Sequence, residues 1–149
     1  MTFAPAVSAD SIRDMLASDH VRLEELFRDV LRRLALDDRD ETRAAWAEFE
    51  RGLSAHLEVE EKMVLPPFSL AFPDEAAAIR AEHEKIRARL LDLGVSVDLH
   101  CIRMSDASDF IRELRDHARR EDALMYRWAD QNLEAAVRTA LRHRLVPRI

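Results

Sequence analysis

Residues 56–66 read HLEVEEKMVLP, and this stretch decides how the rest of the chain is interpreted. Residues four apart on a helix share one face, so His56 and Glu60 point the same way. The residues on one face of this helix recur every three or four positions: Trp46, Phe49, Leu53, His56, Glu60 and Met63. His56 and Glu60 therefore occupy positions on this face where apolar residues are expected. A buried carboxylate without a partner costs roughly 3–5 kcal/mol. A compensating group is therefore expected, and a metal ion is the simplest candidate because imidazole and carboxylate are both common metal ligands.

Composition indicates an all-α fold. The chain has 149 residues, of which 48% are hydrophobic, 35% are charged and only two are glycine. That length suits one domain with its own core, and apolar residues recur at helical spacing throughout. We expect a single domain over residues 1–149, with a helical bundle at about 8–130 and a short C-terminal helix or tail at about 131–149.

The pattern of caps and breakers predicts where the helices begin and end. Helices are expected over about residues 8–36, 38–65, 73–100, 105–128 and 133–145. Ser11 opens a capping-box pattern near the start of the first helix. Pro66 and Pro67 are expected to end the second helix, because proline cannot continue a regular helix. Ser105 and Asp106 are the expected caps of the fourth.

Charge and cysteine content limit the classes of partner and compartment. The net charge of −6 gives no electrostatic reason to expect nucleic acid or an anionic membrane as a partner. The single cysteine, Cys101, suits a reducing cytoplasm. The N-terminal sequence MTFAPAVSAD lacks the features of a signal peptide, and no apolar run approaches membrane-spanning length. We expect a soluble, cytoplasmic protein.

Four histidines are predicted to meet at one height of the bundle. Short loops make consecutive helices antiparallel neighbours, so residues equidistant from a loop lie level with each other. The midpoint of His20 and His56 is residue 38, that of His56 and His83 is about 69–70, and that of His83 and His117 is 100. Each midpoint falls in or beside a predicted connection. The four imidazoles therefore converge on one cross-section.

Two carboxylates complete the predicted cluster. Glu60 and Glu121 each follow a histidine by four residues, on helices that run parallel, so both lie about 6 Å to the same side of the histidine layer. Two imidazoles on each side, with carboxylates able to span between them, suggest a dinuclear metal site. The candidate ligands are His20, His56, Glu60, His83, His117 and Glu121. The alternative is a structural bundle whose polar cluster holds zinc or no metal.

These residues resemble the hemerythrin-like family, which carries the HHE cation-binding domain. The matching motifs are Asp19-His20, His56 through Glu60-Glu61 to Pro66, Glu82-His83, and His117 to Glu121-Asp122. The resemblance covers about residues 10–130. It implies an up-down-up-down antiparallel four-helix bundle that holds two iron ions as a non-haem, oxo- or hydroxo-bridged centre. By the same resemblance His20 and His56 serve one iron, His83 and His117 the other, and Glu60 and Glu121 bridge.

One departure from the family pattern bears on function. Oxygen-carrying hemerythrins have a fifth histidine four residues from the first histidine of the third helix, where this chain has Ile79 or Arg87. Either the second iron has an open position, or Glu24, Glu61 or Glu82 completes the set, or metal is held more weakly.

The function that the resemblance implies is binding, sensing or detoxification of dioxygen, peroxide or nitric oxide at the iron pair. An iron-storage or iron-sensing module without turnover is the alternative, and zinc is a possible substitute for iron. The sequence assigns no catalytic residue, and it leaves open whether there is turnover and which oligomeric state the protein adopts.

Overall fold

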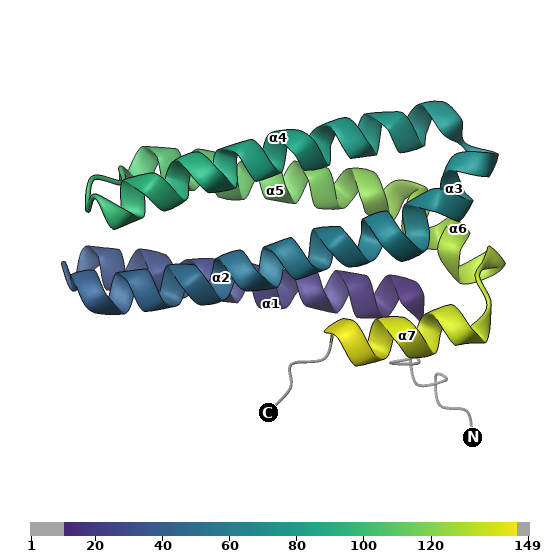
Figure 1. Ribbon diagram of the computed structural model, residues 1–149, viewed down its shortest axis with the longest axis horizontal. Coiled ribbons are helices and arrows are strands. Elements are labelled where there is room, and N and C mark those ends of the chain that lie inside the picture. The colour runs from purple at the N-terminus through teal and green to yellow at the C-terminus, as the bar shows by residue number, and fades with distance from the viewer. Residues whose placement is uncertain (1–10, 146–149) are drawn as a thin grey trace, which may run out of the picture.

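The computed structural model describes residues 11–145, and this part of the chain is all-helical, as predicted. Four long helices form the body of the bundle: α1 (Ile12–Ala35), α2 (Arg39–Val59), α4 (Pro73–Asp98) and α5 (Met104–Ala123). They lie along the long axis of the molecule (Figure 1). Shorter elements surround one end of the bundle: η1 (Glu60–Val64), α3 (Leu65–Ala71), α6 (Met125–Asn132) and α7 (Ala135–Leu145).

The apolar core is divided into two clusters along the bundle. The first contains Leu23, Phe27, Phe49, Leu53, Ile86, Leu90 and Phe110, among others. The second lies towards α3, α6 and α7 and contains Leu16, Val64, Phe68, Ile79, Met125 and Leu141, among others. Burial of these side chains contributes about 25 cal/mol per Å² of apolar area. On α1 and α4, the predicted metal ligands His20 and His83 lie, in sequence, between members of the two clusters.

Local caps explain two of the helix starts. The Asp14 backbone N–H donates to Ser11 Oγ (3.2 Å), and the Glu41 N–H donates to Asp38 Oδ1 (3.1 Å). The expected start of the first helix at residues 8–10 lies outside the described residues. The prediction that Ser105 and Asp106 cap the fourth helix is wrong, because α5 already begins at Met104.

The prediction that Pro66 ends the second helix is also wrong. The helix instead widens into the π-helical turn η1, where the Leu65 N–H donates to the Glu60 carbonyl, and α3 then continues through both prolines. Prolines are tolerated in the first turn of a helix, where the backbone N–H has no intrahelical partner. The wider turn changes the register, so that Val64 rather than Met63 is the next fully buried residue after Glu60.

A second change of register follows Glu121. The prediction of one continuous helix to Trp128 is wrong, because α5 ends at Ala123 and Leu124 adopts a non-helical backbone (φ −134°, ψ −56°) before α6 begins at Met125. Glu60 is thus the first residue of an irregular turn, and Glu121 is followed by one three residues later.

The predicted tail helix is present as α7, which packs against α1 and α2. Its buried residues are Leu141 and Leu145. Within residues 11–145, none of the helices combines the length and the apolar character needed to cross a membrane.

Candidate metal centre

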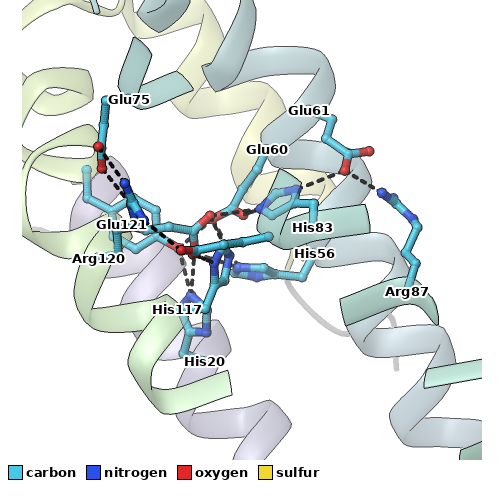
Figure 2. Close-up of polar contacts among 12 residues, drawn as sticks. His20, His56, Glu60, Glu61, Glu75, His83, Arg87, His117, Arg120 and Glu121 are labelled. Atoms are coloured by element: carbon cyan, nitrogen blue, oxygen red, sulfur yellow. Dashed lines mark hydrogen bonds and ion pairs between the residues drawn. The ribbon is translucent and has the colours of Figure 1, made fainter. Parts of the chain in front are cut away.

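One histidine from each long helix points into the middle of the bundle. The rings form two edge-to-face pairs, His20 with His56 at a centroid distance of 4.3 Å and His83 with His117 at 4.9 Å. Three of the four imidazoles are buried, and the His20 side chain is 20% exposed. The structure therefore brings together the four histidines that the sequence placed at one height (Figure 2).

A second layer of carboxylates orients three of these rings. The pairs are Asp19 Oδ2 with His56 Nδ1 (2.8 Å), Glu61 Oε2 with His83 Nδ1 (2.8 Å), and Glu82 Oε1 with His117 Nδ1 (2.7 Å). Each carboxylate accepts the Nδ1 proton, which leaves the Nε2 nitrogen facing the centre of the bundle. Carboxylates in this position fix the ring and raise its basicity when Nε2 is a metal ligand.

Arginines hold these outer carboxylates in turn. Arg22 donates to Asp19 (2.8 Å), and Arg120 donates to Glu82 (2.8 Å) and also binds Glu75. Arg87 donates to Glu61 from the side away from the centre, as Figure 2 shows. Each of the three rings is therefore positioned by a chain of two charged groups that reaches the surface.

Each of the two central carboxylates faces both histidine pairs. Glu60 Oε2 lies 3.2 Å from His56 Nε2, while its Oε1 lies 3.2 Å from His83 Nε2. Glu121 Oε1 lies 3.4 Å from His20 Nε2, while its Oε2 lies 3.0 Å from His83 Nε2. Both glutamates are fully buried. One oxygen of each carboxylate is thus directed at each pair of imidazoles.

The donor atoms form two groups that share the glutamates. Within the described residues, His20, His56, Glu60 and Glu121 offer one set of atoms that all lie within 4.8 Å of one another. Glu60, His83, His117 and Glu121 offer the other. Two ligands bound at right angles to one ion, each about 2.1 Å from it, lie about 3 Å apart, so this spacing fits a metal at each group.

Two buried atoms test whether a cation fits this site. Glu60 Oε1 and His117 Nε2 are both inaccessible to solvent and make no hydrogen bond of regular geometry within the described residues, although they lie at ion-pair distance from His83 Nε2 (3.2 Å) and Glu121 Oε2 (2.9 Å). Leaving a buried acceptor or donor unpaired costs about 1–3 kcal/mol. A metal ion bound by both groups removes this cost, so the donor set fits a cation.

The side chain of Tyr126 also reaches the centre. Its hydroxyl oxygen lies 2.7 Å from His20 Nε2, 3.0 Å from Glu121 Oε1 and 3.5 Å from His56 Nε2, and it donates a short hydrogen bond to Glu60 Oε2. The residue is 1% exposed. Tyr126 is therefore a fully buried polar group on the side of the centre occupied by His20 and His56.

The pKa values show how strongly the groups of the metal-free site interact. Burial by itself lowers the pKa of His56, but the charge of Glu60 and the hydrogen bonds to Asp19 and Glu60 outweigh it and raise that pKa to about 10. For His83, burial is likewise outweighed by hydrogen bonds to Glu121 and Glu60, which raise its pKa to about 10. Without metal, both imidazoles are therefore cations that pair with the central carboxylates.

Glu121 and Tyr126 in the centre also have shifted pKa values. Burial raises the pKa of Glu121, yet hydrogen bonds to His117, His20 and His83 hold it well below its usual range. Burial, followed by the charges of the two central glutamates, raises the pKa of Tyr126 well above 10. In the metal-free protein the phenol is therefore neutral and donates its proton to a carboxylate.

The comparison with protein families agrees with this geometry. A family model described as the hemerythrin HHE cation-binding domain matches residues 11–138. The chain belongs to this family. No match was found among curated proteins or among solved structures. The protein is thus a hemerythrin-like cation-binding domain with two His/Glu clusters that could hold metal.

The residues considered for the missing fifth histidine of this hemerythrin-like domain lie outside both donor groups. Ile79 is fully buried in the second apolar cluster, and the Arg87 side chain is 41% exposed. Glu24 pairs with Arg115, and Glu61 binds the outer nitrogen of a site histidine. Glu82 does the same for another.

Tyr126 was not among the residues predicted from the sequence. In a continuous helix, a residue five positions after Glu121 lies about 140° away around the axis and points elsewhere. The break at Leu124 removes that regular relation and lets the Tyr126 hydroxyl approach Glu121. Helical periodicity therefore gave no signal for this residue.

Surface hollows reach the site from two sides. One is lined by Ala17, His20, Ala118, Arg119, Asp122 and Tyr126. Another is lined by Glu82, Lys85, Ile86, Glu113, Asp116 and His117. One member of each histidine pair, His20 or His117, therefore lines a surface hollow.

Proposed function

We propose that this hemerythrin-like domain holds two iron ions and interacts through them with dioxygen, peroxide or nitric oxide. His20 and His56 hold one ion, His83 and His117 hold the other, and Glu60 and Glu121 bridge them. The scaffold is an up-down-up-down antiparallel four-helix bundle. The single cysteine of the chain favours a reducing, cytoplasmic location.

One observation supports this function above the others. The two oxygens of each central glutamate face different histidine pairs, at 3.2 Å and 3.2 Å for Glu60 and at 3.4 Å and 3.0 Å for Glu121. A carboxylate that serves a single metal needs only one such direction. Bridging carboxylates hold two ions about 3.5–4 Å apart, and two of them supply the negative charge that offsets the repulsion between the ions.

The protein's own residues give the site its character. The apolar clusters on either side exclude bulk water, which strengthens every charge interaction in the centre. The carboxylates behind His56, His83 and His117 keep each Nε2 directed inward. When bound, the iron pair would supply the redox chemistry and the affinity for a small diatomic molecule or peroxide that these side chains lack.

A second function, iron storage or sensing without turnover, is favoured by the burial of the site. Glu60, Glu121, His56 and His83 are all 0% exposed. Such a site holds a metal ion firmly and couples its presence to the stability of the fold.

Metal analysis of the aerobically purified protein, with a visible spectrum, tests the proposal. We expect two irons per chain with charge-transfer bands of a bridged iron pair. Stoichiometric zinc without iron binding would defeat both functions. Addition of nitric oxide to the reduced iron form, or of peroxide to the same form, distinguishes them. A rapid spectral change supports the first function, and an unchanged spectrum supports storage or sensing.

A further inference from the structure

The position of Tyr126 is not explained by the hemerythrin-like ligand set. Its hydroxyl oxygen is surrounded by four polar atoms: His20 Nε2, His56 Nε2, Glu60 Oε2 and Glu121 Oε1. A phenol has one proton, so it donates to one of the two carboxylates at a time. A hydroxyl held in place only to pack the bundle does not need four such neighbours in a fully buried position.

These four neighbours are the four residues of one donor group. The group formed by His20, His56, Glu60 and Glu121 is the one that Tyr126 contacts. The distances of 2.7, 3.0 and 3.5 Å match the separation of about 3 Å between ligands at right angles on one ion. Within the described residues, the hydrogen bonds of the hydroxyl go to this donor group and not to His83 or His117.

We propose that Tyr126 is a metal ligand of the ion held by His20 and His56, an inference that rests on the function proposed above. That ion then has five protein donors: two imidazoles, two carboxylates and the phenolate. The ion held by His83 and His117 has four. Tyr126 is thus the seventh ligand residue of the centre, and it binds the first ion. The second ion has fewer protein donors than the first.

Coordination exchanges a proton for the metal. In the metal-free protein, the phenol donates its hydrogen to Glu60. When iron(III) binds the phenolate oxygen, this proton leaves to solvent and no electron is transferred. A phenolate is an anionic oxygen donor like a carboxylate, and such hard oxygen ligands suit a highly charged ion.

The composition of the chain makes the test unusually clean. Tyr126 is the sole tyrosine among the 149 residues. Any tyrosinate signal of the iron(III)-loaded protein therefore comes from this residue. We expect a phenolate-to-iron charge-transfer band in the visible spectrum and, with excitation into that band, resonance Raman modes of a coordinated tyrosinate ring.

The variants are Y126F and, as the matched control, W128F on the same short helix. Trp128 packs against Phe68 at a ring distance of 5.5 Å, at the edge of the second apolar cluster. The tyrosinate band should be lost in Y126F and retained in W128F. A second readout is the near-ultraviolet change on loading with colourless gallium(III), which should show ionisation of one tyrosine in the native protein and none in Y126F.

The outcomes separate this inference from the proposed function. Two irons per chain without tyrosinate Raman modes in the native protein would overturn the role of Tyr126 and leave the iron pair standing. A native protein that binds neither iron nor gallium overturns both. If Y126F fails to fold, the Raman and gallium measurements on the native protein still decide the matter.

Discussion

The hydrogen bond between Asp19 and His56 offers a direct way to test the second layer of the site. The substitution D19N keeps the size of the side chain and an oxygen that can accept from His56 Nδ1, but it removes the negative charge. Asp19 is 4% exposed, and its oxygens accept from His56 and from Arg22 at 2.8 Å each. Burial raises the pKa of Asp19, but these two partners lower it below its usual value overall, so the native side chain is ionised.

The expected loss follows from that geometry. Removing the carboxylate behind a metal-bound histidine typically weakens metal affinity 10–100-fold. Each tenfold step corresponds to about 1.4 kcal/mol, which gives about 1.4–2.8 kcal/mol here. Because Asp19 is buried, we expect the upper part of this range, whereas E82Q should fall in the lower part because the Glu82 side chain is 33% exposed. In the metal-free protein, D19N should also lower the free energy of unfolding by about 1–3 kcal/mol.

Anaerobic calorimetric titration of the metal-free protein with iron(II) measures the two binding steps. We expect D19N to weaken one step, that of the His20–His56 group, and to leave the other nearly unchanged. The matched control is D29N on the same helix, since Asp29 also pairs with an arginine three residues later but is not paired with a site histidine. Native affinity at both steps in D19N, or an equal loss in D29N, would refute the reasoning.

Three further predictions concern bridging, pH and metal removal. Glu60→Ala should reduce iron binding well below one ion per chain, because Glu60 belongs to both donor groups. His20→Ala should still bind about one iron per chain, because His20 belongs to one group only. A Glu60→Ala protein that binds two irons contradicts the bridging role. The metal-free protein should lose stability as the pH rises from 6.5 towards 10, because folding raises the pKa values of His56 and His83 to about 10. The contribution of these two cations to the free energy of unfolding is complete below pH 6.5 and is lost as the pH rises through 10. Urea unfolding at successive pH values measures this change, and a free energy of unfolding that stays constant over this range contradicts the prediction. Chelation of the iron should lower the melting temperature but leave the helical circular dichroism, and equal melting of both forms would show that metal binding is not linked to folding.

Much of the centre could be predicted from the order and spacing of the residues. The helical spacing of His56 and Glu60, and of His117 and Glu121, requires each pair to share a face. The equal distances of the histidines from the connections bring all four to one level, because antiparallel neighbours joined by short turns leave little freedom in relative height. The spacing of polar residues on the apolar faces of the helices therefore predicted the six-residue cluster.

The outer carboxylates were visible in the sequence, but their role was not. Asp19 and Glu82 directly precede site histidines, yet each binds a histidine of a different helix. Which neighbour a side chain meets depends on the rotation of each helix about its axis. That rotation is set by packing across the bundle and not by the helix's own sequence.

The sequence by itself determined the helices, the shared height of the histidines and the two carboxylates beside them, because these features follow from the regular repeat of an α-helix. Only the tertiary structure decided what happens where that repeat is interrupted. The π-turn that begins at Glu60 and the break at Leu124 each shift the register of the residues that follow. No periodic rule anticipates such a shift, and it is the shift at Leu124 that accompanies the entry of Tyr126 into the centre.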